Sequence, residues 1–252
     1  MKTSNDFIYG INPVLELLKR TPERIDKIFV RKNATLNKFD LIQSLASDNK
    51  IAINQVPVEK LDELAEQNNH QGIVAAVSTV VYKNFTDWID SIEIGNDTAV
   101  LLLDEIEDPQ NLGAILRTAA AAGIDAVLVP KHRQAPVSGT VMKISAGTAG
   151  RIPVVRIGNV NQTILELKDH GFWIAGLEKS GETSIWGQKY DVPMVFIIGN
   201  EGRGMRKKTT EHCDFLLSVP MHNDVESLNA SVSAALICYE WRRQKEFEKQ
   251  GD

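Results

Sequence analysis

Six short apolar runs, most of them separated by stretches suited to helices, constrain the fold of residues 98–252 more than any other feature. The runs consist mostly of Val, Ile, Leu, Phe and Ala, and they lie at 99–103, 126–129, 152–155, 172–177, 194–198 and 215–219. Strands of this kind are buried on both faces, which is typical of a parallel sheet covered by helices. We therefore expect a mostly parallel, six-stranded α/β domain whose ligand binds beyond the carboxyl ends of the strands.

The first 78 residues alternate helix and strand on a smaller scale. Asn12 and Pro13 suit the N-cap and the first position of a helix. Residues 79–97 are polar, acidic and less regular. The sequence therefore predicts two domains, 1–78 and 98–252, joined by a linker over 79–97. The other elements expected in the first domain are strands near 27–30, 51–56 and 72–77, and helices over 37–48 and 57–67.

Charge is unevenly distributed along the chain. The net charge of −5 argues against a protein held on nucleic acid by bulk attraction. Lysine and arginine nevertheless gather, without any acid, over 126–165 and again over 202–210. Such a local basic face fits a phosphate-bearing partner, although solvated side chains at strand ends would give the same pattern. Three residues of this face, Lys131, Arg133 and Arg203, are our candidates for contacts with RNA.

The remaining composition points to a cytoplasmic protein. The 252 residues contain two cysteines, Cys213 and Cys238, in no metal-like spacing, so we expect reduced thiols and no metal. The sequence shows no apolar run long enough for a membrane span and no secretory signal, so we expect no membrane partner.

Two polar loops follow expected strands, where a ligand should bind. In the first, Asn111 and Arg117 lie in a helix otherwise rich in alanine and glycine. In the second, residues 199–204 form a Gly-x-x-Gly-x-Gly turn that contains Glu201. Glycines allow a ligand to approach backbone N–H groups closely. Taken singly, Asn111 could be a plain N-cap, Arg117 a solvent-facing tip and Glu201 a solvated side chain.

A third polar loop follows the last strand. It runs over 220–231 and carries Ser227 and Asn229 ahead of a long apolar helix. Either residue could simply cap that helix. Because the three loops should share one edge of the sheet, their polar residues together indicate one site.

At this point the sequence resembles the SpoU-type RNA ribose methyltransferases of the SPOUT superfamily. The three motifs that carry the resemblance are 111–117 (NLGAILR), 197–205 (IIGNEGRGM) and 219–221 with 227–232 (VPM and SLNASV). Residues 9–14 with Glu16, and His70 to Ile73, resemble the RNA-binding, L30e-like domain of that family. Two departures, the acidic loop 222–226 and Ser138 in place of an expected asparagine, lie outside the three motifs.

The resemblance implies a fold and a reaction. The fold is an L30e-like α/β domain followed by a SPOUT domain with a deep trefoil knot near its C-terminus. The reaction is methyl transfer from S-adenosylmethionine to a ribose 2′-hydroxyl in RNA, with a guanosine of bacterial 23S rRNA as the expected target. The family also implies a homodimer with active sites at the subunit interface.

The resemblance also implies roles for single residues. Arg117 is assigned to the ribose 2′-hydroxyl, and because arginine keeps its proton we expect it to clamp the neighbouring phosphate and the developing oxyanion. Asn111 would orient the ribose or Arg117, Glu201 would pair with Arg117 or fix its loop, and Ser227 with Asn229 would set the third loop. The residues expected to hold the donor are Gly199, Val219 and Leu228, through backbone groups, with Leu177, Gly202 and Met221 nearby.

Three other functions stay open from the sequence alone. The same chemistry could act on tRNA. A dinucleotide-dependent oxidoreductase is another class, but its glycine motif has a different spacing and follows the first strand of the fold. A non-catalytic RNA-binding module would have no need of Arg117 or Glu201.

Overall fold

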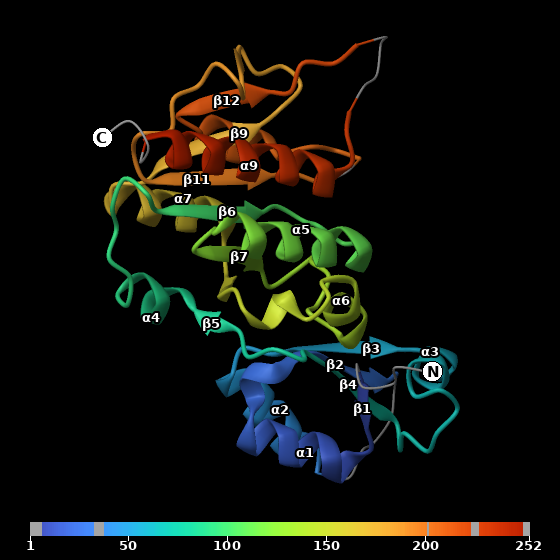
Figure 1. Ribbon diagram of the computed structural model, residues 1–252. Coiled ribbons are helices and arrows are strands. Elements are labelled where there is room, and N and C mark those ends of the chain that lie inside the picture. Colours follow the sequence, from blue (N-terminus) through green and yellow to red (C-terminus); the bar gives the residue numbers. More distant parts are fainter. Residues whose placement is uncertain (1–6, 33–37, 201, 223–226, 249–252) are drawn as a thin grey trace. The chain divides into compact units, whose positions relative to one another are not determined.

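The chain divides into two compact units. The computed structural model describes residues 7–32, 38–200, 202–222 and 227–248. One unit comprises Met1–Val81 with Pro136–Thr140, and the other comprises Tyr82–Ala135 with Val141–Asp252. Figure 1 shows both units, coloured along the sequence.

The smaller unit is a four-stranded mixed sheet with its helices packed against it. The strand order is β1-β4-β2-β3, in which only β2 and β3 run parallel. Helices α1 and α2 cover a core that includes Val14, Leu18, Ile28 and Ile42. Its elements are β1 (Phe7–Tyr9), α1 (Ile11–Arg20), η1 (Pro22–Arg24), β2 (Ile25–Arg31), α2 (Phe39–Asp48), β3 (Ala52–Val56), α3 (Val58–Leu64) and β4 (Ile73–Val77).

The larger unit is built on a parallel sheet in the order β10-β12-β9-β11-β6-β7-β8-β5. Every neighbouring pair in it is parallel. The sheet has eight strands, so the expected count of six was wrong. Its strands are β5 (Lys83–Asn84), β6 (Ala99–Leu103), β7 (Ala126–Pro130), β8 (Val154–Ile157), β9 (Trp173–Leu177), β10 (Thr183–Ser184), β11 (Met194–Ile198) and β12 (Phe215–Ser218).

Helices cover both faces of this sheet. On one face α4 and α7 pack on alternate strand residues such as Val100, Leu128 and Ile197. On the other, α5 and α9 lie side by side (Figure 1). No helix in the described ranges is both long enough and apolar enough to cross a membrane. The helices are α4 (Phe85–Ile89), α5 (Pro109–Ala122), α6 (Gly139–Ile144), η2 (Thr148–Gly150), α7 (Val160–Asp169), α8 (Lys207–Glu211) and α9 (Ala230–Glu248).

Two residues suited to N-caps in the sequence, Asn12 and Asn111, do not cap their helices in the structure. Helix α1 is capped by Gly10 rather than Asn12. Helix α5 is capped by Asp108, whose carboxylate accepts a hydrogen bond from the backbone of Gln110, and Pro109 takes its first position. The segment 79–97, expected to be a linker, contains β5 and α4, and β5 pairs with β8.

Candidate active site

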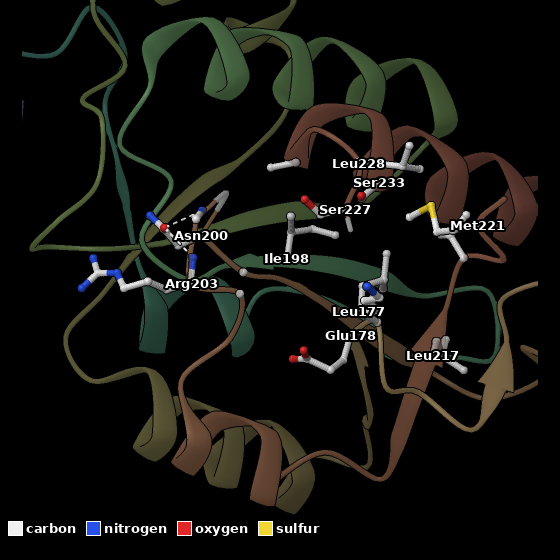
Figure 2. A pocket seen from close by; sticks show the side chains of 16 residues that line it. Leu177, Glu178, Ile198, Asn200, Arg203, Leu217, Met221, Ser227, Leu228 and Ser233 are labelled. Carbon is white, nitrogen blue, oxygen red and sulfur yellow. Dashed lines mark hydrogen bonds between the residues drawn. The ribbon is translucent and has the colours of Figure 1, made fainter. Parts of the chain in front are cut away.

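Three neighbouring strands, β9, β11 and β12, end at one cavity. Its volume is about 360 Å³, within the range of small-molecule sites. Figure 2 shows Leu177 and Ile198 at the ends of β9 and β11, with Glu178 and Asn200 just beyond them. Ser227, Leu228 and Ser233 lie on the α9 side. The cavity therefore lies where a parallel sheet of this kind binds ligands.

A tight glycine loop after β11 forms one wall of the cavity. The backbones of Asn200 and Gly204 exchange two hydrogen bonds of 3.1 and 2.9 Å, which close the loop. The Asn200 side-chain oxygen accepts hydrogen bonds from the backbones of Gly202 and Arg203, and its amide donates 2.9 Å to the carbonyl of Glu105. A Cβ on Gly199 would lie 2.5 Å from the backbone of Gly204 and Met205. Only glycine fits at this position.

Every residue expected to hold the donor lines this cavity. These are Leu177, Gly199, Gly202, Val219, Met221 and Leu228. The cavity is also lined by Glu178 and Lys179, which follow β9 directly, and by Ser233 in α9, none of which was predicted from the sequence. Their signal in the sequence was their position, just after a buried strand for the first two and directly after the third motif for Ser233.

Two expected active-site residues are brought together next to the cavity although they lie far apart in the chain. The amide of Asn229 donates a 2.9 Å hydrogen bond to the side-chain oxygen of Asn111, which is buried in the first turn of α5. The Asn229 oxygen also accepts from the backbone of Ser231, so this residue caps α9 as well. Ser227 lines the cavity. The first and third motifs thus meet.

Arg117 lies farther along α5 and does not line the cavity. Its side chain is exposed and makes no hydrogen bond or ion pair with the parts of the chain that the structure describes. Glu201 lies outside the described residues, and so does most of the acidic loop 222–226. The expected contact between Glu201 and Arg117 therefore stays a prediction.

The double role of Asn229 leads to a stability prediction. Asn229→Ala removes both the cap and the bond to Asn111, and we expect it to lower the free energy of unfolding by about 1–2 kcal/mol. Asn229→Ser should lose less stability, because serine can still cap the helix. It should not recover all of it, because serine is too short to replace the amide that donates to Asn111. Urea denaturation of the three proteins measures the difference. An alanine variant as stable as the parent would show that neither bond contributes.

Two buried acids directly after β6 bind arginines from other loops. Asp104 accepts two hydrogen bonds from Arg206, at 2.7 and 3.2 Å. Glu105 pairs with Arg133 at 3.3 Å and with Arg203 at 3.4 Å. Arg133 and Arg203, two of the three candidates for contacts with RNA, are thus each paired with a buried carboxylate. Lys131 is exposed. Counting charges along the sequence could not reveal these pairs, because the partners are 28 and 98 residues apart.

Comparison with known proteins agrees with this architecture. Residues 98–239 match the model of the SpoU rRNA methylase family, and residues 7–82 match the model for the substrate-binding domain of RNA 2′-O ribose methyltransferases. The two matches together cover most of the chain.

Similar proteins and structures carry related descriptions. A Staphylococcus haemolyticus protein assigned to the TrmH family of tRNA/rRNA methyltransferases is 40% identical over 88% of this chain and 89% of its own. The Bacillus subtilis protein YacO, of the same description, is 37% identical over 97% of this chain and 98% of its own. The SpoU methyltransferase AviRb of Streptomyces viridochromogenes, solved with AdoMet, shares the fold with a TM-score of 0.60 at 22% identity, over 95% of this chain and 90% of its own. The chain therefore belongs to the SpoU rRNA methylase family of RNA methyltransferases.

Proposed function

We propose that this protein methylates a ribose 2′-hydroxyl in 23S rRNA, with a guanosine as the target nucleoside. The observation that carries the proposal is the cavity after β9, β11 and β12, which is lined by all six expected donor residues and adjoins the Asn111–Asn229 pair. The dinucleotide alternative lacks support, because the glycine loop follows β11 near the middle of the sheet and not the first strand of the unit.

The methyl donor is S-adenosylmethionine, and the cavity fits it. Leu177, Val219 and Leu228 supply apolar walls for an adenine ring, while the absence of a side chain at Gly199 leaves the adjoining loop backbone closely packed. Glu178 places a carboxylate at the cavity, opposite in charge to the sulfonium and ammonium groups of the donor. When bound, the donor supplies an electrophilic methyl group, and the protein supplies orientation.

The other motif residues would position the nucleophile. Asn111, held by Asn229, would orient the ribose. Arg117 would clamp the adjacent phosphate and the oxyanion that develops as the 2′-hydroxyl attacks. The hydroxyl proton would pass to the phosphate or to water, because a guanidinium does not accept it. The bond between methyl carbon and sulfur breaks as the bond to oxygen forms.

A homodimer and a trefoil knot belong to the same proposal. Arg117 is exposed on α5 and does not line the cavity of its own chain, which supports an arrangement in which a second copy completes the site. The knot would form where α9 passes through a loop near the third motif. Sedimentation equilibrium tests the dimer, and a monomer at micromolar concentration that retains full activity would contradict it.

The RNA target rests on the substrate-binding domain and on the rRNA methylase family model. The experiment is transfer of labelled methyl groups onto purified rRNA and tRNA pools, followed by mapping of the 2′-O-methyl position. We expect incorporation into 23S rRNA at one guanosine. Incorporation into tRNA alone would overturn the choice of 23S rRNA as the target. A complete lack of incorporation into both pools would overturn the methyltransferase proposal.

A further inference from the structure

An ion-pair cluster next to the donor cavity has buried acids and exposed arginines. The side chains of Asp104 and Glu105 are 1% and 8% exposed, whereas those of Arg133, Arg203 and Arg206 are 63%, 66% and 49% exposed. The cluster thus combines three guanidinium groups that face solvent with two carboxylates that are buried.

Glu105 lies at the centre of this cluster. Its carboxylate contacts Arg133 at 3.3 Å, Arg203 at 3.4 Å and Arg206 at 3.6 Å, from loops after two different strands. Its backbone carbonyl accepts the Asn200 amide, so the same residue also ties down the glycine loop. One carboxylate therefore lies within ion-pair distance of three guanidinium groups, two of which, those of Arg133 and Arg203, pair with no other acid among the described residues.

Backbone strain supports a functional role for this arrangement. Glu105 and Arg133 adopt the left-handed conformation, with φ of 67° and 53°. Residues with a side chain rarely adopt it, and such strain clusters at binding and catalytic sites. Two hydrogen bonds hold the loops together here, from the Ala135 N–H to the Ile106 carbonyl and from the Ile106 N–H to the Gln134 side chain. The loop backbones are fixed while the arginine tips stay exposed.

We propose that Glu105 is a positioning residue for an RNA backbone site formed by Arg133 and Arg203. The buried carboxylate holds two exposed guanidinium groups side by side beside the donor cavity, where each can donate paired hydrogen bonds to a phosphate. Figure 2 shows Arg203 extending away from the cavity. This inference rests on the proposed function, because it assigns the phosphates to the RNA that receives the methyl group.

Charge and geometry make opposite predictions for Glu105→Gln. The change removes a negative charge near RNA, so bulk attraction alone predicts tighter binding. If Glu105 orders the arginines, RNA binding by the variant should instead weaken by about fivefold or more. Without the carboxylate, the two long arginine side chains become ordered only when RNA binds, and that ordering costs binding free energy. Glu107→Gln is the matched control, since this exposed acid lies in the same loop and has no ion pair with the residues that the structure describes.

The experiment measures the Kd of the full-length variants for a labelled single-stranded U20 RNA over a range of salt concentrations, together with the KM and kcat of methyl transfer to 23S rRNA. We expect Glu105→Gln to weaken binding and raise KM with little change in kcat, and Glu105→Asp to recover part of the loss. Arg133→Gln and Arg203→Gln should each reduce the slope of log Kobs against log salt by about 0.7.

Several results would overturn the inference. RNA binding by Glu105→Gln as tight as that by Glu107→Gln would refute it. Unchanged salt slopes in both arginine variants, which alter only exposed side chains, would also refute it even if Glu105→Gln failed to fold. In either case, methyl transfer to 23S rRNA by the parent protein would show that only this inference had failed. A parent protein that neither binds RNA nor transfers methyl groups would refute the proposed function as well.

Discussion

Replacing Arg117 with lysine is expected to lower kcat for methyl transfer by roughly 100-fold or more, while the Kd for S-adenosylmethionine stays the same. Arg117 does not line the donor cavity, so donor binding should not depend on it. A lysine keeps the positive charge but cannot donate two parallel hydrogen bonds to a phosphate. Single-turnover rates at saturating RNA and donor, with calorimetry for the donor, measure both effects.

A control for Arg117 lies on the neighbouring helix. Arg242 in α9 is also partly exposed, and among the described residues its ion pair is a local one with Glu246, four residues on. Arg242→Lys should leave kcat unchanged. Full kcat in Arg117→Lys would exclude a phosphate clamp that requires the guanidinium group of Arg117.

Placing a methyl group on Gly199 is expected to cause the largest loss of donor affinity. The new Cβ would lie 2.5 Å from the backbone of Gly204 and Met205, and backbone atoms cannot rotate away as a side-chain tip can. Opening the loop would break the paired hydrogen bonds between Asn200 and Gly204. Overpacking of this kind costs about 1–3 kcal/mol, which corresponds to a roughly 5- to 150-fold increase in Kd if only the closed loop binds.

The matched variant is Gly202→Ala in the same loop. A Cβ there would meet only the Asn200 side-chain oxygen, at an ordinary 3.6 Å, so we expect a smaller loss of donor affinity. Calorimetric titration of both variants with S-adenosylmethionine makes the comparison, and thermal melting checks that each is folded. Equal affinities for the parent and Gly199→Ala would mean that the closed loop is not needed for donor binding.

The apolar strands could be located from the sequence because burial on both faces leaves a continuous run of apolar residues. Strand β6 lies over the residues expected, and β8 is displaced by two residues from the expected 152–155. The short strands β5 (Lys83–Asn84) and β10 (Thr183–Ser184) could not be found, because they are two residues long, polar and set by the edges they pair with. The start of α5 was misplaced because two good capping residues, Asp108 and Asn111, compete in the sequence.

Some features of the candidate site could be predicted from the sequence and others could not. Its glycine loop and apolar walls follow from motifs that are local in sequence, so the cavity could be anticipated. The partners of Arg133 and Arg203 depend on which strands are neighbours in the sheet, and local charge patterns do not contain that information. Asp104 and Glu105 had one visible signal, two acids directly after a buried strand, which in a parallel sheet marks the ligand-binding edge.

The loop after β11 has a thermodynamic consequence because it belongs to two sites. Gly199 and Arg203 both border the donor cavity, while the Arg203 guanidinium is paired with Glu105 in the arginine cluster. If donor binding shifts this loop, it changes the affinity for RNA by some factor, and linkage requires RNA to change the affinity for the donor by the same factor. The affinities for the two substrates would then be coupled through this single shared segment.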